Sequence, residues 1–393
     1  MPPGEAGGRH SPIRLLQLTA FTSTLDRFAM PPMLVAIAVD LGVPLSQVVQ
    51  AAGVYFLAYG LMQPVWGMVS DPLGLVRTMR VTLLLAAVST TAAAFVSTPL
   101  ALAVTRGLAG GFFGAAFPSS LIYLGDTVPA ERRQKEVTRL LAGVALGTTI
   151  ASVGAGFVAH LLSWRVAFLA TGLAALVLAV ALRGLAPPPV TRARRNPLGS
   201  LLQVARTRSA TLVLVLAFAE GAVLLGALTL LPPAVEATGA SAAVAGTVTA
   251  GYGVSVLGSA RLVGNLSRRY HPARLIGLGA TAAFVACVVL SVSQEPPAAV
   301  LVALLLGLAY TAMHSSLQTW ATEVLPPLRA TVVSLFAGSL FVGSAVAAVL
   351  VSGLAEAGRY GEIFALAAAT TVPLGLVATW SRARWQRPCE EAA

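Results

Sequence analysis

Long apolar runs recur along the whole chain, and they constrain its fold more than any other feature. A helix needs about 20 consecutive, mostly apolar residues to cross a bilayer, and the sequence contains twelve such segments. Hydrophobic residues make up 56% of the chain and charged residues only 10%, whereas soluble domains are about 45–50% apolar and about 25% charged. The sequence therefore predicts an all-α membrane protein with twelve transmembrane helices. Their expected limits are 13–38, 47–69, 79–97, 100–124, 138–161, 164–183, 209–231, 241–262, 274–293, 298–322, 331–354 and 361–380.

Basic residues support this number of spans, because they fall almost entirely on one side of the predicted membrane. With the N-terminus inside, 22 of the 26 Lys and Arg residues lie in cytoplasmic segments, and only Arg165 and Arg359 lie outside. Cytoplasmic loops of membrane proteins carry such an excess of positive charge. Lys135 is the only lysine, a bias that fits a GC-rich bacterial genome. We therefore expect a multi-pass protein of the bacterial cytoplasmic membrane, with both termini in the cytoplasm.

The longest connection divides the predicted spans into two groups of six. It contains three consecutive prolines and a run of arginines, which break the apolar pattern. Two halves of six spans are typical of parallel-repeat secondary transporters, which bind substrate near the bilayer midplane between the halves. We expect an N-terminal bundle over 1–183, a basic cytoplasmic linker over 184–208, a C-terminal bundle over 209–381 and a cytoplasmic tail over 382–393.

Short motifs in the first half carry a family resemblance. Residues 67–77 read GMVSDPLGLVR, residues 106–110 read RGLAG, and residues 163–168 read SWRVAF. These stretches resemble three signatures of the major facilitator superfamily, namely G-x-x-x-D-[RK]-x-G-[RK]-[RK], R-x-x-x-G and G-W-R-x-x-F. The pattern is closest to the bacterial twelve-span drug/proton antiporters, although the fifth span keeps only Gly156 of their G-P-x-x-G-G signature. The resemblance implies the major facilitator fold.

The first of these motifs implies a gating loop between spans 2 and 3. In the resembled family, its glycines allow close packing, and its Asp and bases form a cytoplasmic latch. Here Pro72, Leu75 and Val76 replace the usual bases, so a tight turn is expected but a charge relay is in doubt. The residues that match or remain are Gly67, Asp71, Gly74 and Arg77.

Ionisable residues inside the predicted spans are the main functional candidates, because a charge within a bilayer is costly to keep. They occur in spans 1, 4, 7 and 10, which line the central cavity in the resembled family. We assign them to a network of charges that couples transport to protons. Its members are Asp26, Arg27, Arg106, Glu220 and His314.

Helical spacing predicts how the first two of these charges point. Thr19, Thr22, Ser23 and Asp26 share one helix face, and Arg27 lies about 100° around the helix. We expect Asp26 to face the cavity and Arg27 to face a flank or the next helix, the alternative being a local structural ion pair. The prolines at 31 and 32 follow at once and predict a kink, since proline removes a backbone donor.

The other candidates also have two interpretations. Glu220 has only apolar neighbours on its own helix face, so it is either a proton carrier or a hydrogen-bonded structural acid. His314 either titrates or is a satisfied structural residue, and Arg106 either holds an acid or packs against a neighbouring span. Polar and aromatic stripes at helical spacing predict substrate contacts, with simple packing as the alternative. These residues are Thr22, Tyr55, Tyr59, Gln63, Tyr310 and Gln318.

These observations favour a transporter over other classes of protein. The sequence has no G-x-x-x-x-G-K-[ST] loop for ATP and no H-E-x-x-H or G-x-S-x-G motif, and its histidines do not cluster. We expect no enzymatic activity, metal, cofactor or nucleic-acid partner. The partners are a small molecule, protons and the lipid bilayer, and the protein is expected to be a monomer. The leading hypothesis is proton-coupled efflux of a small amphipathic or hydrophobic compound. Proton-coupled uptake of a polar nutrient and a non-transporting membrane sensor are the alternatives.

Overall fold

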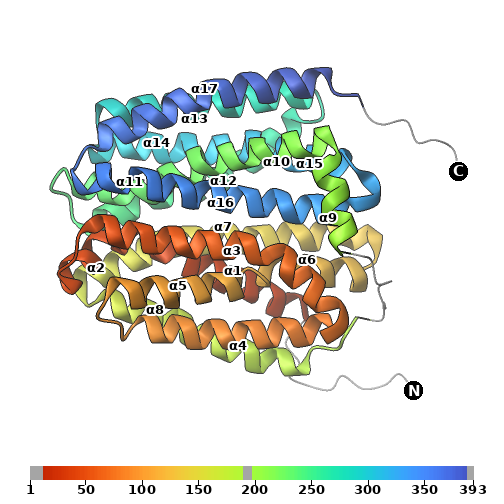
Figure 1. Ribbon diagram of the computed structural model, residues 1–393, viewed down its shortest axis with the longest axis horizontal. Coiled ribbons are helices and arrows are strands. Elements are labelled where there is room, and N and C mark those ends of the chain that lie inside the picture. The colour runs from red at the N-terminus through yellow and green to blue at the C-terminus, as the bar shows by residue number, and fades with distance from the viewer. Residues whose placement is uncertain (1–11, 189–196, 387–393) are drawn as a thin grey trace, which may run out of the picture.

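The protein is a bundle of long helices that run along one axis (Figure 1). The computed structural model describes residues 12–188 and 197–386. All regular elements within these two ranges are helical. The helices of the first half of the chain lie in the lower part of Figure 1, and those of the second half lie in the upper part.

The first half consists of six helical segments, three of which are interrupted or extended. The N-terminal segment is not one continuous helix, because a short 3-10 turn at Pro31–Met33 separates its two parts. The kink predicted from the two prolines is therefore confirmed. The elements are α1 (Pro12–Ala29), η1 (Pro31–Met33), α2 (Leu34–Leu41), α3 (Leu45–Leu73), α4 (Leu75–Ala93), α5 (Pro99–Phe113), α6 (Ala116–Thr127), α7 (Ala130–Leu161), α8 (Trp164–Ala181) and η2 (Leu182–Gly184).

A short helix, α9 (Pro197–Arg206), lies within the predicted linker and leads into the second half. Two of the later spans contain a π-helical turn near their middle. The elements are α10 (Arg208–Glu220), η3 (Gly221–Leu225), α11 (Gly226–Glu236), α12 (Ala242–Leu266), α13 (Pro272–Val292), α14 (Pro296–Ala309), η4 (Tyr310–His314), α15 (Ser315–Glu323), η5 (Pro326–Leu328), α16 (Arg329–Glu356) and α17 (Tyr360–Arg384).

The predicted spans agree with these helices in number and order. Among the described residues, 11 segments are long and apolar enough to cross a membrane. The twelfth segment, α1 with η1 and α2, packs against α7 and α8 in the same bundle. It is less apolar because it carries Arg14, Asp26 and Arg27. Several limits differ by four or more residues. The third helix runs over Leu75–Ala93 rather than 79–97, the fifth begins at Ala130 rather than 138, and the seventh ends at Glu236 rather than 231.

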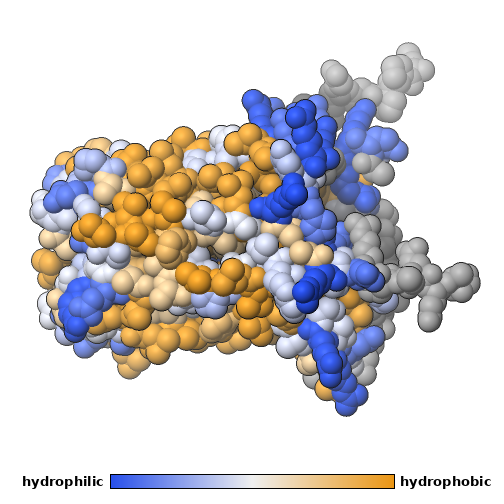
Figure 2. Space-filling model, turned by 90° about the horizontal axis from the view of Figure 1, so that it is seen from above, coloured by the Kyte–Doolittle hydropathy of each residue, from blue (hydrophilic) through white to orange (hydrophobic). Residues whose placement is uncertain are grey.

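The outer surface of the bundle is suited to lipid. Figure 2 shows a broad apolar belt, with most of the strongly hydrophilic side chains gathered at one end of the bundle. Large apolar side chains stay exposed along the helices, including Leu100, Val292 and Leu350. Apolar surface of this extent marks contact with a membrane rather than with water. We call the hydrophilic end the basic end, because the helix ends that meet there carry Arg77, Arg183, Arg268, Arg274 and Arg384.

The two halves meet through small residues on two pairs of helices. Between α7 and α12, Gly156 and Gly246 face each other so closely that an added Cβ on either would overlap the other helix. Between α3 and α16, Gly60 and Gly338 make the same kind of contact. Without side chains in the way, the backbones approach closely, as in many membrane helix pairs. At these two crossings the halves meet backbone to backbone, and elsewhere along α3 and α16 the Phe56 and Tyr59 rings pack on Phe341.

At the end opposite the basic end, α2 is tied to α8 by one acidic residue. The carboxylate of Asp40 forms an ion pair with Arg165 and accepts a hydrogen bond from the Trp164 indole at 3.2 Å. The hydrogen bond from Arg165 lowers the pKa of Asp40 below its ordinary value of 3.8. The stability that this pair contributes is therefore complete above that value and is lost as the pH falls through the lowered pKa.

We predict that the Asp40→Asn variant loses this acid-dependent part of its stability. Below pH 3.8, the melting temperature of the parent protein in detergent should fall more steeply than that of the variant. The control is Glu362→Gln, which removes another exposed acid paired with an arginine and should leave the slope unchanged. Equal slopes for Asp40→Asn and the parent would contradict the prediction.

Candidate functional site

A fully buried ion pair joins the first and fourth spans. One Asp26 carboxylate oxygen accepts a hydrogen bond from Arg106 Nη1 at 3.1 Å, and the other accepts one from Nη2 at 3.0 Å. The same Nη2 also donates to the backbone carbonyl of Asp26 at 3.2 Å. Both side chains have no exposed surface. The expectation that Arg106 holds an acid is therefore confirmed, and that acid is Asp26.

Four helices of the first half converge on this carboxylate. Thr90 of α4 and Thr171 of α8 both donate hydroxyl hydrogen bonds to the oxygen Oδ1 of Asp26, at 3.2 and 3.1 Å. The Arg106 guanidinium lies 4.5 Å from the centroids of the Tyr55 and Phe168 rings. Aromatic faces stabilise a cation that has left water. Neither threonine was predicted as a site residue, although each is a polar residue in an apolar span.

A second buried pair joins the seventh and tenth spans. Nδ1 of His314 lies 3.2 Å from Oε2 of Glu220, and Glu220 has no exposed surface. The interpretation of Glu220 as a lone carboxyl was wrong, because helical spacing within one span does not show what a neighbouring span contributes. Its other oxygen, Oε1, has no hydrogen-bond partner among the described residues. The His314 ring stacks on Tyr310 at 4.3 Å and lies 5.5 Å from Phe336.

Irregular backbone brackets this second pair. Glu220 immediately precedes the π turn η3, and His314 ends the π turn η4. Such π turns are rare and occur frequently at functional sites. Gly221 lies directly after Glu220, and a Cβ there would overlap the carbonyl of Leu340 on α16. Glu220 therefore lies next to the point where its own helix and α16 are in direct backbone contact.

The two pairs occupy corresponding positions in the two halves. Asp26 and Arg106 lie on spans 1 and 4, whereas Glu220 and His314 lie on spans 7 and 10. The predicted network of charges thus separates into two pairs, each within one half. The pairs differ in chemistry, because a guanidinium stays protonated in proteins while an imidazole changes its charge near neutral pH.

Arg27 points the opposite way from its neighbour Asp26. Its guanidinium lies 4.8 Å from the Phe28 ring and 5.1 Å from the rings of Tyr59 and Phe341. Phe341 belongs to α16, so Arg27 reaches the second half of the protein. The prediction for Asp26 was wrong, because the stripe that carries it packs against the first half's own helices. The contact of Arg27 with Tyr59 of α3 agrees with the expected approach to the next helix. Arg27 forms no ion pair with the described residues, and its buried Nε has no partner among them.

The residues predicted to contact substrate do not form one wall. Tyr55 packs on Arg106, whereas Tyr59 contacts Arg27 and Phe341. Tyr310 stacks on His314 and lies 5.9 Å from Tyr252 of α12. The remaining three stay predictions, because the structure gives their burial and no specific partner. Thr22 and Gln63 are buried and Gln318 is half-buried.

The expected gating loop is a turn of a single residue. Helix α3 ends at Leu73, α4 begins at Leu75, and Gly74 between them has a φ of 83°. This left-handed conformation favours glycine, because a side chain there would be strained. Gly67 and Arg77 flank the turn on the two helices, and the Asp71 side chain lies outside the described residues. The tight turn is confirmed, while the latch stays a prediction.

Sequence comparison assigns the chain to a family. The profile of the Major Facilitator Superfamily matches residues 16–333, and a second match covers 227–388. The chain belongs to the Major Facilitator Superfamily. Its members are membrane transporters, so transport across a membrane by a multi-pass protein is supported, but the drug/proton antiporter branch is not. A comparison with curated protein sequences found no significant match.

Solved structures share the fold at low sequence identity. A mutant of the peptide transporter POT superposes with a TM-score of 0.79 and 16% identity, covering 95% of this superfamily member and 94% of POT. A mutant of the nucleoside transporter NupG gives 0.78 and 14%, covering 95% and 100%. A bacterial homologue of the human lysosomal transporter Spinster, inward-facing and unoccupied, gives 0.77 and 17%, covering 98% and 100%. These similarities establish the fold and leave the substrate open.

We predict that Asp26→Asn destabilises the protein by about 3–5 kcal/mol, because it leaves the Arg106 guanidinium buried without its counter-ion. The measurement is thermal unfolding in detergent, and the matched comparison is the double variant Asp26→Leu/Arg106→Met. Removing both charges should restore most of the stability. An Asp26→Asn variant as stable as the parent would show that the pair is not structural.

Proposed function

We propose that this chain is a proton-coupled secondary transporter that moves a small amphipathic molecule by alternating access. It acts as a monomer in a bacterial cytoplasmic membrane, with both termini in the cytoplasm. The observation that carries the proposal is the buried Glu220–His314 pair, in which two groups that can exchange a proton lie 3.2 Å apart beside two π turns. Buried titratable groups inside a membrane protein mark proton pathways by default.

The Glu220–His314 pair suits proton transfer better than the Asp26–Arg106 pair. Arg106 keeps its charge, and the Asp26 carboxylate already accepts hydrogen bonds from Arg106, Thr90 and Thr171. Protonating Asp26 would leave a buried guanidinium uncompensated. Glu220, by contrast, has one oxygen without a partner among the described residues, and it lies beside an imidazole, a group that can bind or release a proton. We therefore assign the proton to Glu220 with His314 and a structural role to Asp26.

The contacts between the halves support a rocking motion. The facing glycines of α7 and α12, and of α3 and α16, present backbone rather than interlocking side chains. Helices that meet in this way can slide or rotate without first unpacking a core. The π turns in spans 7 and 10 add irregular backbone at the level of the proton site. Alternating access by movement of one half against the other is the motion that this construction favours.

The direction of coupling is a separate proposal with two candidates. The first is efflux of an amphipathic or hydrophobic compound by proton antiport, which the motifs of the first half support. The second is symport of a proton with an anionic amphipathic molecule, which the position of Arg27 supports. A guanidinium among three aromatic rings, with no acidic partner in the described part of the chain, is suited to hold a carboxylate. The rings around it would contact an apolar or aromatic portion of the same molecule.

An anion at Arg27 would affect the proton site. Arg27 lies over the Phe341 ring, and His314 of the proton site lies 5.5 Å from the Phe336 ring on the same helix, α16. Neutralising Arg27 with an anion would remove a positive charge that opposes protonation of the Glu220–His314 pair. Binding couplings are reciprocal, so protonation would also favour the anion. Mutual strengthening produces symport, whereas antiport requires the proton and the substrate to exclude each other.

We predict that Glu220→Gln uncouples transport from protons without abolishing it. Reconstituted liposomes with an imposed pH gradient would be tested with lipophilic cations, neutral drugs, sugars and aromatic carboxylates. The variant should lose gradient-driven accumulation of the transported probe, while exchange at equal pH continues. The control Glu362→Gln removes an exposed acid and should behave as the parent. Accumulation that survives in Glu220→Gln would overturn the proton assignment, and no transport of any probe by the parent would favour a non-transporting sensor.

We predict that Arg27 selects the charge of the substrate. If the symport candidate is correct, aromatic carboxylates enter with protons, and a pH-sensitive dye inside the liposomes reports acidification. Arg27→Gln should weaken carboxylate transport by about tenfold or more, because a charge-assisted hydrogen bond contributes about 1.5–3 kcal/mol, and Arg27→Lys should retain part of it. If the parent instead transports cations in exchange for protons, and Arg27→Gln does so at the same rate, antiport would be established.

A further inference from the structure

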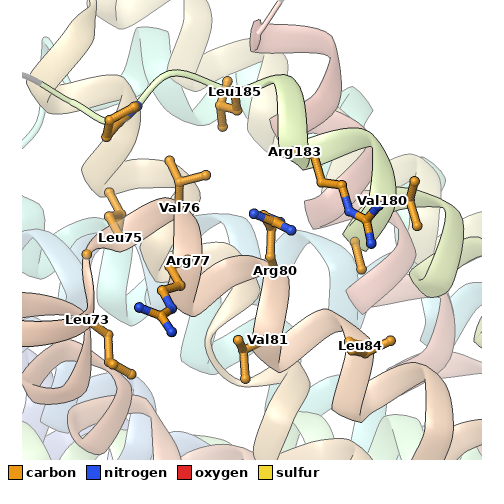
Figure 3. Close-up of a pocket in the computed structure, with 13 residues that line it drawn as sticks. Leu73, Leu75, Val76, Arg77, Arg80, Val81, Leu84, Val180, Arg183 and Leu185 are labelled. Atoms are coloured by element: carbon orange, nitrogen blue, oxygen red, sulfur yellow. The ribbon is translucent and has the colours of Figure 1, made fainter.

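A pocket opens at the basic end, between the start of α4 and the end of α8. Its volume is about 460 Å³, and it is lined by 13 of the described residues. Three of these are arginines: Arg77 and Arg80 come from α4, and Arg183 comes from η2 (Figure 3). None of the described lining residues is acidic. The pocket therefore carries a concentrated positive charge that its own walls do not balance.

The three guanidinium groups are also without protein partners. Arg77, Arg80 and Arg183 form no hydrogen bond or ion pair with any residue that the structure describes. The Nε atom of Arg80 is buried and has no acceptor among those residues. A buried donor left unpaired costs free energy, and like charges around one pocket repel each other. Both costs are removed by one ligand, an anion with several oxygen acceptors such as a phosphate.

Part of the pocket's remaining wall is apolar and faces outward. Leu73, Val81, Leu84 and Val180 line it, and each is between 43% and 48% exposed. They belong to the apolar belt of the bundle and continue from the arginines toward the middle of the helices. A water-soluble anion would make no use of this surface. An amphipathic anion would lay its apolar portion along the leucines and valines while its charged group met the arginines.

We propose that this pocket binds the phosphate headgroup of an anionic phospholipid from the surrounding membrane. The phosphate contacts Arg77, Arg80 and Arg183, and the acyl chains run along Val81, Leu84 and Val180. Basic residues at the membrane surface attract anionic lipids in this way. The geometry also gives the lipid a structural effect, because the pocket includes Gly74, the single-residue turn between α3 and α4. A bound headgroup would fasten this turn to η2.

The test is lipid binding by the full-length protein in detergent. Native mass spectrometry would measure retention of phosphatidylglycerol against phosphatidylcholine, and the melting temperature would be followed as each lipid is added. Phosphatidylglycerol should bind preferentially and raise the melting temperature. Each of Arg77→Gln, Arg80→Gln and Arg183→Gln should weaken its binding about fivefold, and the triple variant about a hundredfold, because one basic residue near the surface contributes about that much.

A matched control removes the same charge from the same end of the molecule. The variant Arg268→Gln/Arg269→Gln/Arg274→Gln changes three arginines outside the pocket and should leave phosphatidylglycerol binding unchanged. An equal loss in both triple variants would overturn the proposal, because binding would then follow the overall charge. Stabilisation by inorganic phosphate as large as that by phosphatidylglycerol would overturn the lipid as the ligand. If the triple variant does not fold, phosphatidylglycerol binding is measured on Arg80→Gln alone, and binding equal to that of the parent would overturn the proposal.

Discussion

The ion pair between Asp26 and Arg106 is the interaction on which the first half of this protein depends. Two charges without any exposed surface are unfavourable inside a membrane unless each meets a complete set of partners. Asp26 obtains them from three other helices, through Arg106, Thr90 and Thr171. The pair therefore fixes how spans 1, 3, 4 and 6 stand relative to one another. It also turns the polar face of α1 inward, which leaves Arg27 to face the second half.

The corresponding spans of the second half hold a pair of different chemistry, an acid with an imidazole. Glu220 and His314 keep the spacing of an acid–base pair, but they lack the permanent charge that makes the first pair rigid. The glycine contacts at Gly221 and Gly343 hold the helix of Glu220 close to α16, while π turns interrupt the regular backbone beside Glu220 and His314. One half thus carries a fixed charge pair and the other a titratable one. This difference makes the two halves chemically asymmetric at corresponding spans.

Much of the fold followed from the sequence, because the energetic cost of exposing backbone in lipid forces each long apolar run to be a helix. The kink at Pro31 and the turn at Gly74 followed in the same way, since both depend on local backbone chemistry. The candidate charges were also visible, because ionisable residues stand out in apolar spans. The residues that pair with these charges could not be identified from the sequence. Thr90 and Thr171 look ordinary in sequence, and the meeting of Glu220 with His314 spans 94 positions of the chain.

The sequence by itself determined which segments cross the membrane, in what order, and which of them carry charges. It did so because helix formation and membrane insertion depend on residues close together in the chain. Only the tertiary structure decided which way those charges point. Asp26 and Arg27 are neighbours about 100° apart on one helix, so the choice of which one faces the other half depends on what the surrounding helices offer. The first half offers Arg106 and two hydroxyls to an acid, and the aromatic rings at the boundary accept the cation.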